Sequence, residues 1–111
     1  MEINQEHINN ICVIRLEGNV MGGPEAVKVN DLINQLLDDD EQRLIIDLGE
    51  VNRMNSSGLG ILINALTTFK QNGGELKLAN LTDRVKGLLA ITKLNTIFES
   101  YDTVDAAIDS F

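Results

Sequence analysis

The most informative part of this chain begins with Leu44-Ile45-Ile46-Asp47-Leu48 and ends with Met54-Asn55-Ser56-Ser57-Gly58-Leu59-Gly60. Its first segment is short and almost entirely apolar, which is typical of a central strand covered on both faces. A helix is predicted after it, because apolar residues recur there at helical spacing: Leu59, Leu62, Ala65, Leu66 and Phe69. The stretch is therefore interpreted as a strand, a serine-containing loop and a helix.

The same alternation extends in both directions from this stretch. Strands are predicted over 2–6 and 11–17 with a turn at Asn9-Asn10, and further strands over 75–79 and 97–101. Helices are predicted from Pro24 to near Leu37 or Asp38, from Leu59 to Asn72-Gly73-Gly74, after Thr82-Asp83 and after Asp102-Thr103. This order predicts an α/β fold: a small mixed sheet, with an opening antiparallel hairpin and then parallel strands, and about four helices packed against it.

The composition favours a single cytoplasmic domain over residues 1–111. Apolar residues make up 43% of the chain, and no segment has the roughly 18 uncharged apolar residues of a membrane helix. Residues 1–7 lack the basic region and apolar run of a signal peptide, and Cys12 is the only cysteine. The net charge of −8 argues against direct nucleic-acid binding, since such binding needs clustered Lys and Arg to replace counterions.

Two serines, Ser56 and Ser57, stand where a strand ends and a helix begins. In α/β sheets, the loops at the carboxyl ends of the strands gather functional groups. A phosphate there would carry about −1.5 to −2 charges, and a helix N-terminus would favour it by about 0.3–1 kcal/mol. Serine is also a preferred N-cap, so the residues alone leave two compatible interpretations open: capping and modification.

The other candidate residues do not indicate catalysis, a metal site or a cofactor. His7 is the only histidine, so neither a zinc site nor a hydrolase base beside Ser56 or Ser57 is indicated. Phosphate-binding glycine loops and the nucleophile elbow are absent. The acidic run Asp38-Asp39-Asp40-Glu41 lacks the spacing of a calcium loop and is interpreted as solvated, and Cys12 as inert core.

The segment Asn55-Ser56-Ser57-Gly58-Leu59-Gly60 resembles the Asp-Ser-Ser-Gly-Leu-Gly signature of the STAS family (sulfate transporter and anti-sigma factor antagonist). Further resemblance lies in Val13-Ile14-Arg15-Leu16-Glu17-Gly18, in residues 44–48 and in Asn72-Gly73-Gly74-Glu75-Leu76. The resemblance implies a STAS-like fold and the function of an anti-sigma factor antagonist, which binds a partner and catalyses no reaction.

In that family, a cognate serine kinase phosphorylates the first serine of the pair. The kinase is itself the anti-sigma factor or a relative of it. The unphosphorylated antagonist sequesters this kinase, phosphorylation ends the binding, and a metal-dependent serine phosphatase restores it. By position, the implied target is Ser56, with Ser57 as the alternative target and expected helix cap. The implied partner-binding residues are Met21, Gly22, Gly23, Met54, Asn55, Ser56, Ser57, Gly58 and Leu59.

Two positions depart from the family pattern. Asn55 replaces the usual Asp, which predicts slower phosphorylation if that carboxylate activates the serine hydroxyl. Met21 replaces a residue that is often acidic, and it either joins the contact surface or covers the edge of the core. These departures suggest a divergent branch with a client other than a sigma factor. They also leave open an unphosphorylated structural or adaptor subunit of a signalling or lipid-transport complex.

Overall fold

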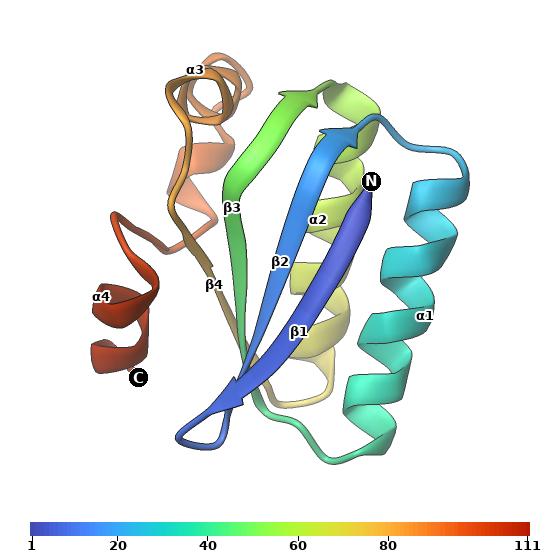
Figure 1. The fold of residues 1–111 in the computed structure, drawn as a ribbon, viewed down its shortest axis with the longest axis vertical. Helices are drawn as coiled ribbons and strands as arrows, with labels where there is room; N and C mark the ends of the chain where they lie inside the picture. The colour runs from blue at the N-terminus through green and yellow to red at the C-terminus, as the bar shows by residue number, and fades with distance from the viewer.

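A mixed sheet with the strand order β1-β2-β3-β4-β5 forms the centre of the structure (Figure 1). The computed structural model describes residues 1–111, and it confirms the predicted order of strands and helices. The strands are β1 (Glu2–Ile8), β2 (Ile11–Val20), β3 (Arg43–Met54), β4 (Glu75–Ala79) and β5 (Ser100–Tyr101). The helices are α1 (Pro24–Asp38), α2 (Ser56–Gln71), α3 (Asp83–Ile91) and α4 (Val104–Asp109), with a 3-10 turn η1 (Leu94–Thr96). Strands β1 and β2 pair antiparallel and all other neighbours pair parallel, as predicted.

Local chemistry accounts for several element boundaries. Asn9 and Asn10 have φ values of 50° and 65°, the left-handed conformation that a two-residue hairpin turn of type I′ requires. Pro24 occupies the first turn of α1, where its missing N–H costs nothing. The Thr82 hydroxyl accepts a hydrogen bond from the Val85 N–H and caps α3. The predicted hairpin turn, start of α1 and cap of α3 are confirmed.

Four strand lengths differ from the prediction. Strand β1 extends to Ile8 rather than to residue 6, and β2 extends to Val20 rather than to residue 17, because each continues to pair with its neighbour. Strand β3 continues past Leu48 to Met54, because its second half pairs with β2 as far as Val20 and Met54. There, Val51 is buried while Glu50, Asn52 and Arg53 are exposed, so the apolar run that marks a central strand is missing. Strand β5 contains only Ser100 and Tyr101 rather than 97–101, because Ile97 ends η1 in a helical conformation.

The helices cover the two faces of the sheet unequally. The main core joins β2, β3 and β4 to α1, α2 and α3, and Phe69 is its largest fully buried side chain. Cys12 lies in this core, and burial raises the pKa of its thiol to about 11, which accords with an inert cysteine. A smaller cluster on the opposite face includes Ile45 and Ala107 and lies under α4. No helix of the structure has the length and apolar character needed to span a membrane.

Buried charges on the α4 face are all partnered. Asp47 accepts hydrogen bonds from the Gly49 N–H, the Asn80 side chain and Arg15, and the Arg15 bond raises the pKa of that guanidinium. The Lys77 ammonium, in a side chain 5% exposed, donates to the carbonyl and hydroxyl oxygens of Ser110 just after α4. Lys77 therefore ties the C-terminal segment to the sheet.

Candidate functional site

Two loops meet at the end of the sheet where β2 and β3 finish (Figure 1). One joins β2 to α1 and contains Met21, Gly22 and Gly23; the other is the junction at Asn55 between β3 and α2. They start side by side, because Val20 and Met54 are paired across the parallel strands. The two groups of residues predicted to bind a partner are thus brought together by the strand pairing.

Close packing between the loops depends on two glycines. A Cβ on Gly58 would lie 1.9 Å from the carbonyl oxygen of Val20, and one on Gly22 would lie 2.8 Å from the Cβ of Ser57. Gly22 also has a φ of 98°, which side chains rarely allow. The missing side chain of Gly58 therefore makes room for β2. Gly60, by contrast, faces open space.

The N-cap of α2 is Asn55, and the predicted capping role of Ser57 is wrong. The Asn55 side-chain oxygen accepts a hydrogen bond of 2.9 Å from the Gly58 N–H. Asn55 has extended backbone angles, as an N-cap does, and the helix already begins at Ser56. Asn and Ser cap equally well by local preference, so the geometry at the end of β3 decides between them.

Ser56 and Ser57 are both exposed in the first turn of α2. This turn contains no acidic residue, and first-turn N–H groups have no partner within a helix. The backbone of Gly22 lies against Ser57. A phosphate on either hydroxyl would meet the positive end of the helix dipole without an acidic residue in that turn.

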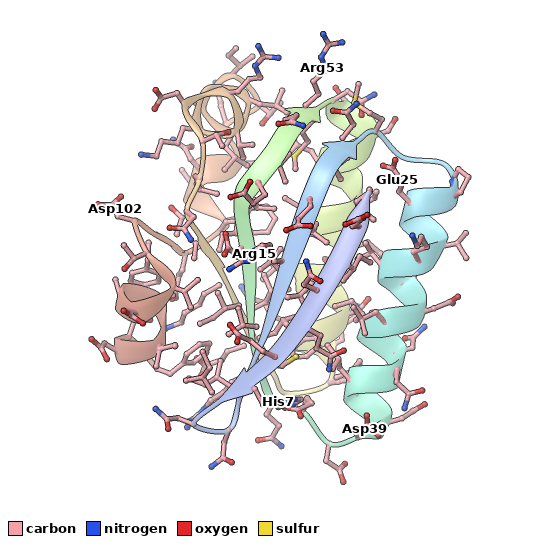
Figure 2. The ribbon with its side chains drawn as sticks, in the orientation of Figure 1. His7, Arg15, Glu25, Asp39, Arg53 and Asp102 are labelled. Carbon is pink, nitrogen blue, oxygen red and sulfur yellow. The ribbon has the colours of Figure 1, made fainter.

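Side chains of the β2–α1 loop add an apolar part to this site. Met21 is 40% exposed, and its backbone N–H donates a hydrogen bond of 2.8 Å to the Glu25 carboxylate. Figure 2 shows Glu25 beside this loop and Arg53 extending outward at the same end of the molecule. Val27 on α1 is also exposed, at 59%.

The predicted partner-binding residues differ in accessibility. We call the exposed and half-exposed group the serine surface: Met21, Gly22, Gly23, Asn55, Ser56 and Ser57. Met54 is half-buried and packs against the core. Gly58 is buried and Leu59 is only 2% exposed, so the side chain of Leu59 belongs to the core and not to this surface.

The polar residues at the other end of the molecule lie far from this site. Figure 2 places His7 and Asp39 opposite Arg53 and Glu25. His7 is exposed, and its Nε2 lies against the carboxylate of Glu41, at the end of the acidic run. No group of three or more His, Cys, Asp or Glu side chains is arranged to hold a metal ion.

Comparison with known proteins gives a consistent result. The STAS domain model matches residues 2–107. The anti-sigma F factor antagonist of Paenibacillus polymyxa is 26% identical over 107 residues, covering 92% of this chain and 87% of that protein. An anti-sigma factor antagonist from Mycobacterium paratuberculosis superposes with a TM-score of 0.84 at 22% identity, covering 98% of this chain and 92% of that one.

A second solved structure extends the comparison. The Bacillus cell fate determinant SpoIIAA, in its phosphorylated form, superposes with a TM-score of 0.75 at 19% identity, covering 98% of both chains. At these identities, the structural likeness concerns the fold. It confirms the STAS-like arrangement that the sequence resemblance implied.

Proposed function

The chain belongs to the STAS domain family, and from this membership we propose that it is an anti-sigma factor antagonist whose binding is switched by phosphorylation of Ser56. It acts by binding a partner protein through the serine surface and carries out no chemistry. The partner is a serine kinase that is itself an anti-sigma factor or a relative of one. A metal-dependent serine phosphatase acts on the phosphorylated form, and the switch operates in the cytosol.

The observation that carries this proposal is the place of Ser56. It is exposed at the first position of α2, with Asn55 and Ser57 beside it in the serine surface. Asn55 already satisfies the Gly58 N–H, so the Ser56 hydroxyl is not needed as a cap and is available for modification. The names of the relatives support the antagonist role, and SpoIIAA has been solved in a phosphorylated form.

The expected loss of affinity on phosphorylation follows from charge and desolvation. A phosphate adds about −1.5 to −2 charges, and an unpaired charge within an interface costs about 2–5 kcal/mol. Because each 1.4 kcal/mol corresponds to about a tenfold change in Kd, binding should weaken by roughly thirtyfold to a few thousandfold.

The test starts with the kinase isolated from the host through its binding to this chain. Its Kd is then measured by calorimetry for wild type, for the enzymatically phosphorylated protein, for Ser56→Ala and for Ser56→Glu. Phosphorylated protein and Ser56→Glu should bind at least about thirtyfold more weakly, while Ser56→Ala should bind as wild type does. Ser57→Ala is the matched control and should still be phosphorylated.

Mass spectrometry of the reaction mixture locates the phosphate. Equal affinities of Ser56→Glu and wild type, or a phosphate found only outside residues 55–58, would overturn the proposal. Unphosphorylated protein from every growth state of the host, together with retained binding by Ser56→Glu, would favour the adaptor role instead.

A further inference from the structure

Helix α3 presents an outer face that nothing in the chain covers. Val85 and Leu89 turn into the core, whereas six residues of the helix are exposed. Asp83 begins the helix, and we call the other five the α3 face: Arg84, Lys86, Gly87, Ala90 and Ile91. In Figure 1, no other helix or strand lies on this outer side.

Ile91 is the most exposed large apolar side chain of the protein. It is 82% exposed at the end of α3, and Ile97, which follows η1, is 43% exposed. Isolated apolar residues on a surface are ordinary. These two, however, lie in the same short α3–η1 region, where helix and turn contact each other. An apolar surface with polar borders is typical of a protein contact.

Gly87 lies in the interior of α3, where packing within this chain does not explain the choice of a glycine. A Cβ placed there would meet nothing within 4 Å, so no close packing within this chain requires a glycine. Apart from proline, glycine is the residue least suited to a helix interior. With Ala90 one turn further on, it makes the middle of the α3 face flat. Small residues at such a place let a second helix approach closely, because interaxial distance depends on the side chains at the contact.

The charge of this region is opposite to that of the whole protein. Residues 83–98 contain three of the nine basic residues, Arg84, Lys86 and Lys93, and one acidic residue, Asp83, although the net charge of the chain is −8. None of the three cations forms an ion pair within the chain. At about 3.6 residues per turn, Arg84 and Lys86 border the small residues on opposite sides.

From these observations we infer that the α3 face is a second docking surface, whose occupant is an acidic amphipathic helix of another protein. The small and apolar contact residues of that helix lie on Gly87, Ala90 and Ile91. Its carboxylates lie beside Arg84 and Lys86. Helix recognition by an apolar stripe with charged borders is a common mode of binding. This surface is separate from the serine surface and does not depend on the function proposed for Ser56.

The experiment uses the full chain and a defined probe. The probe is a helical peptide of about five turns, with a stripe of Ala and Leu bordered by Glu; in its counterpart, every Glu is Lys. Backbone amide resonances are followed while each peptide is added up to about 1 mM. The Glu peptide should shift resonances of residues 83–93, and the Lys peptide should not.

Variants then assign the contact. Arg84→Glu combined with Lys86→Glu should weaken the Kd of the Glu peptide by about tenfold or more, and so should Ile91→Ser or Gly87→Leu. The matched control is Lys28→Glu combined with Lys70→Glu, which makes the same charge change on α1 and α2 and should leave the Kd unchanged. Circular dichroism establishes that each variant is folded. Ser56→Asp should also leave this Kd unchanged, which separates the result from that of the serine switch.

Several outcomes would overturn the inference. These are no binding of the Glu peptide, shifts scattered beyond the α3 region, or equal weakening by the Lys28 and Lys70 control. Phosphatidylglycerol vesicles are added in parallel. If they shift the resonances of α3 while the peptide does not, the α3 face meets a membrane and not a protein helix.

Discussion

Replacing Gly58 with alanine tests whether the serine surface depends on close contact between α2 and β2. The new Cβ would lie 1.9 Å from the Val20 carbonyl oxygen, 2.9 Å from the carbonyl carbon of that residue and 3.0 Å from the Met54 side chain. Reaching even 3.0 Å from the oxygen requires a shift of about 1.1 Å. The two closest contacts are backbone atoms of Val20, so no change of rotamer can relieve them.

The magnitude follows from two opposing effects. Overpacking a well-packed site costs typically about 1–3 kcal/mol, while alanine gains at most about 1 kcal/mol over glycine in a helix. Because the closest contact is with backbone, the cost lies at the upper end of this range, and Gly58→Ala should lower the free energy of unfolding by about 2 kcal/mol. Gly60→Ala is the matched control, because its Cβ would meet nothing within 4 Å in the same helix. That variant should raise the free energy of unfolding by about 0.5–1 kcal/mol.

Urea unfolding followed by circular dichroism measures both changes, with equal m-values as the check on two-state behaviour. The melting temperatures should move in opposite directions, by about 4 °C for each kcal/mol. If Gly58→Ala proved at least as stable as wild type, α2 would not pack closely against the backbone of β2. If Gly60→Ala lost the same amount of stability, the destabilisation would come from alanine in this part of the helix and not from the contact with Val20.

Three further predictions concern single residues. Burial raises the pKa of the Cys12 thiol from 9.0 to about 11. The contribution of this thiol to the free energy of unfolding is therefore complete below pH 9, and it is lost by up to about 1.4 kcal/mol per pH unit as the pH rises to about 11. In urea titrations at several pH values, Cys12→Ala should lack this part of the pH dependence. Lys77→Met removes both hydrogen bonds to Ser110, so amide exchange in α4 should quicken while exchange in α2 stays unchanged. Asn55→Asp keeps an acceptor for the Gly58 N–H and adds charge at the helix N-terminus, so urea unfolding should show a gain of about 0.3–1 kcal/mol.

The elements that could be predicted from sequence are those whose cause is local. The turn at Asn9-Asn10, the start of α1 at Pro24 and the cap at Thr82 each follow from the conformational preference of one or two residues. The second half of β3 could not be found this way, because its only partner there is β2, far away along the chain. The shortness of β5 likewise reflects the helical conformation of Ile97 at the end of η1.

The candidate site shows the same division. Its position at a strand-to-helix junction, and the serine pair itself, were evident from residues 54–60. Local preference could not choose among Asn55, Ser56 and Ser57 as the cap, since all three are good capping residues. Accessibility could not be predicted either: the motif as a whole was assigned to partner contact, yet Leu59 is buried while Ser56 and Ser57 are exposed.

The amino-acid sequence by itself determined the order of strands and helices and the place of the serine pair, because periodicity and turn chemistry act over a few residues. Only the tertiary structure decided that the Met21 loop lies beside Ser57, that Gly58 makes room for β2, and that the outer side of α3 stays uncovered. Those features depend on contacts between segments that are distant along the chain. Such contacts decide which residues are buried and which remain exposed, and local sequence preferences do not determine them.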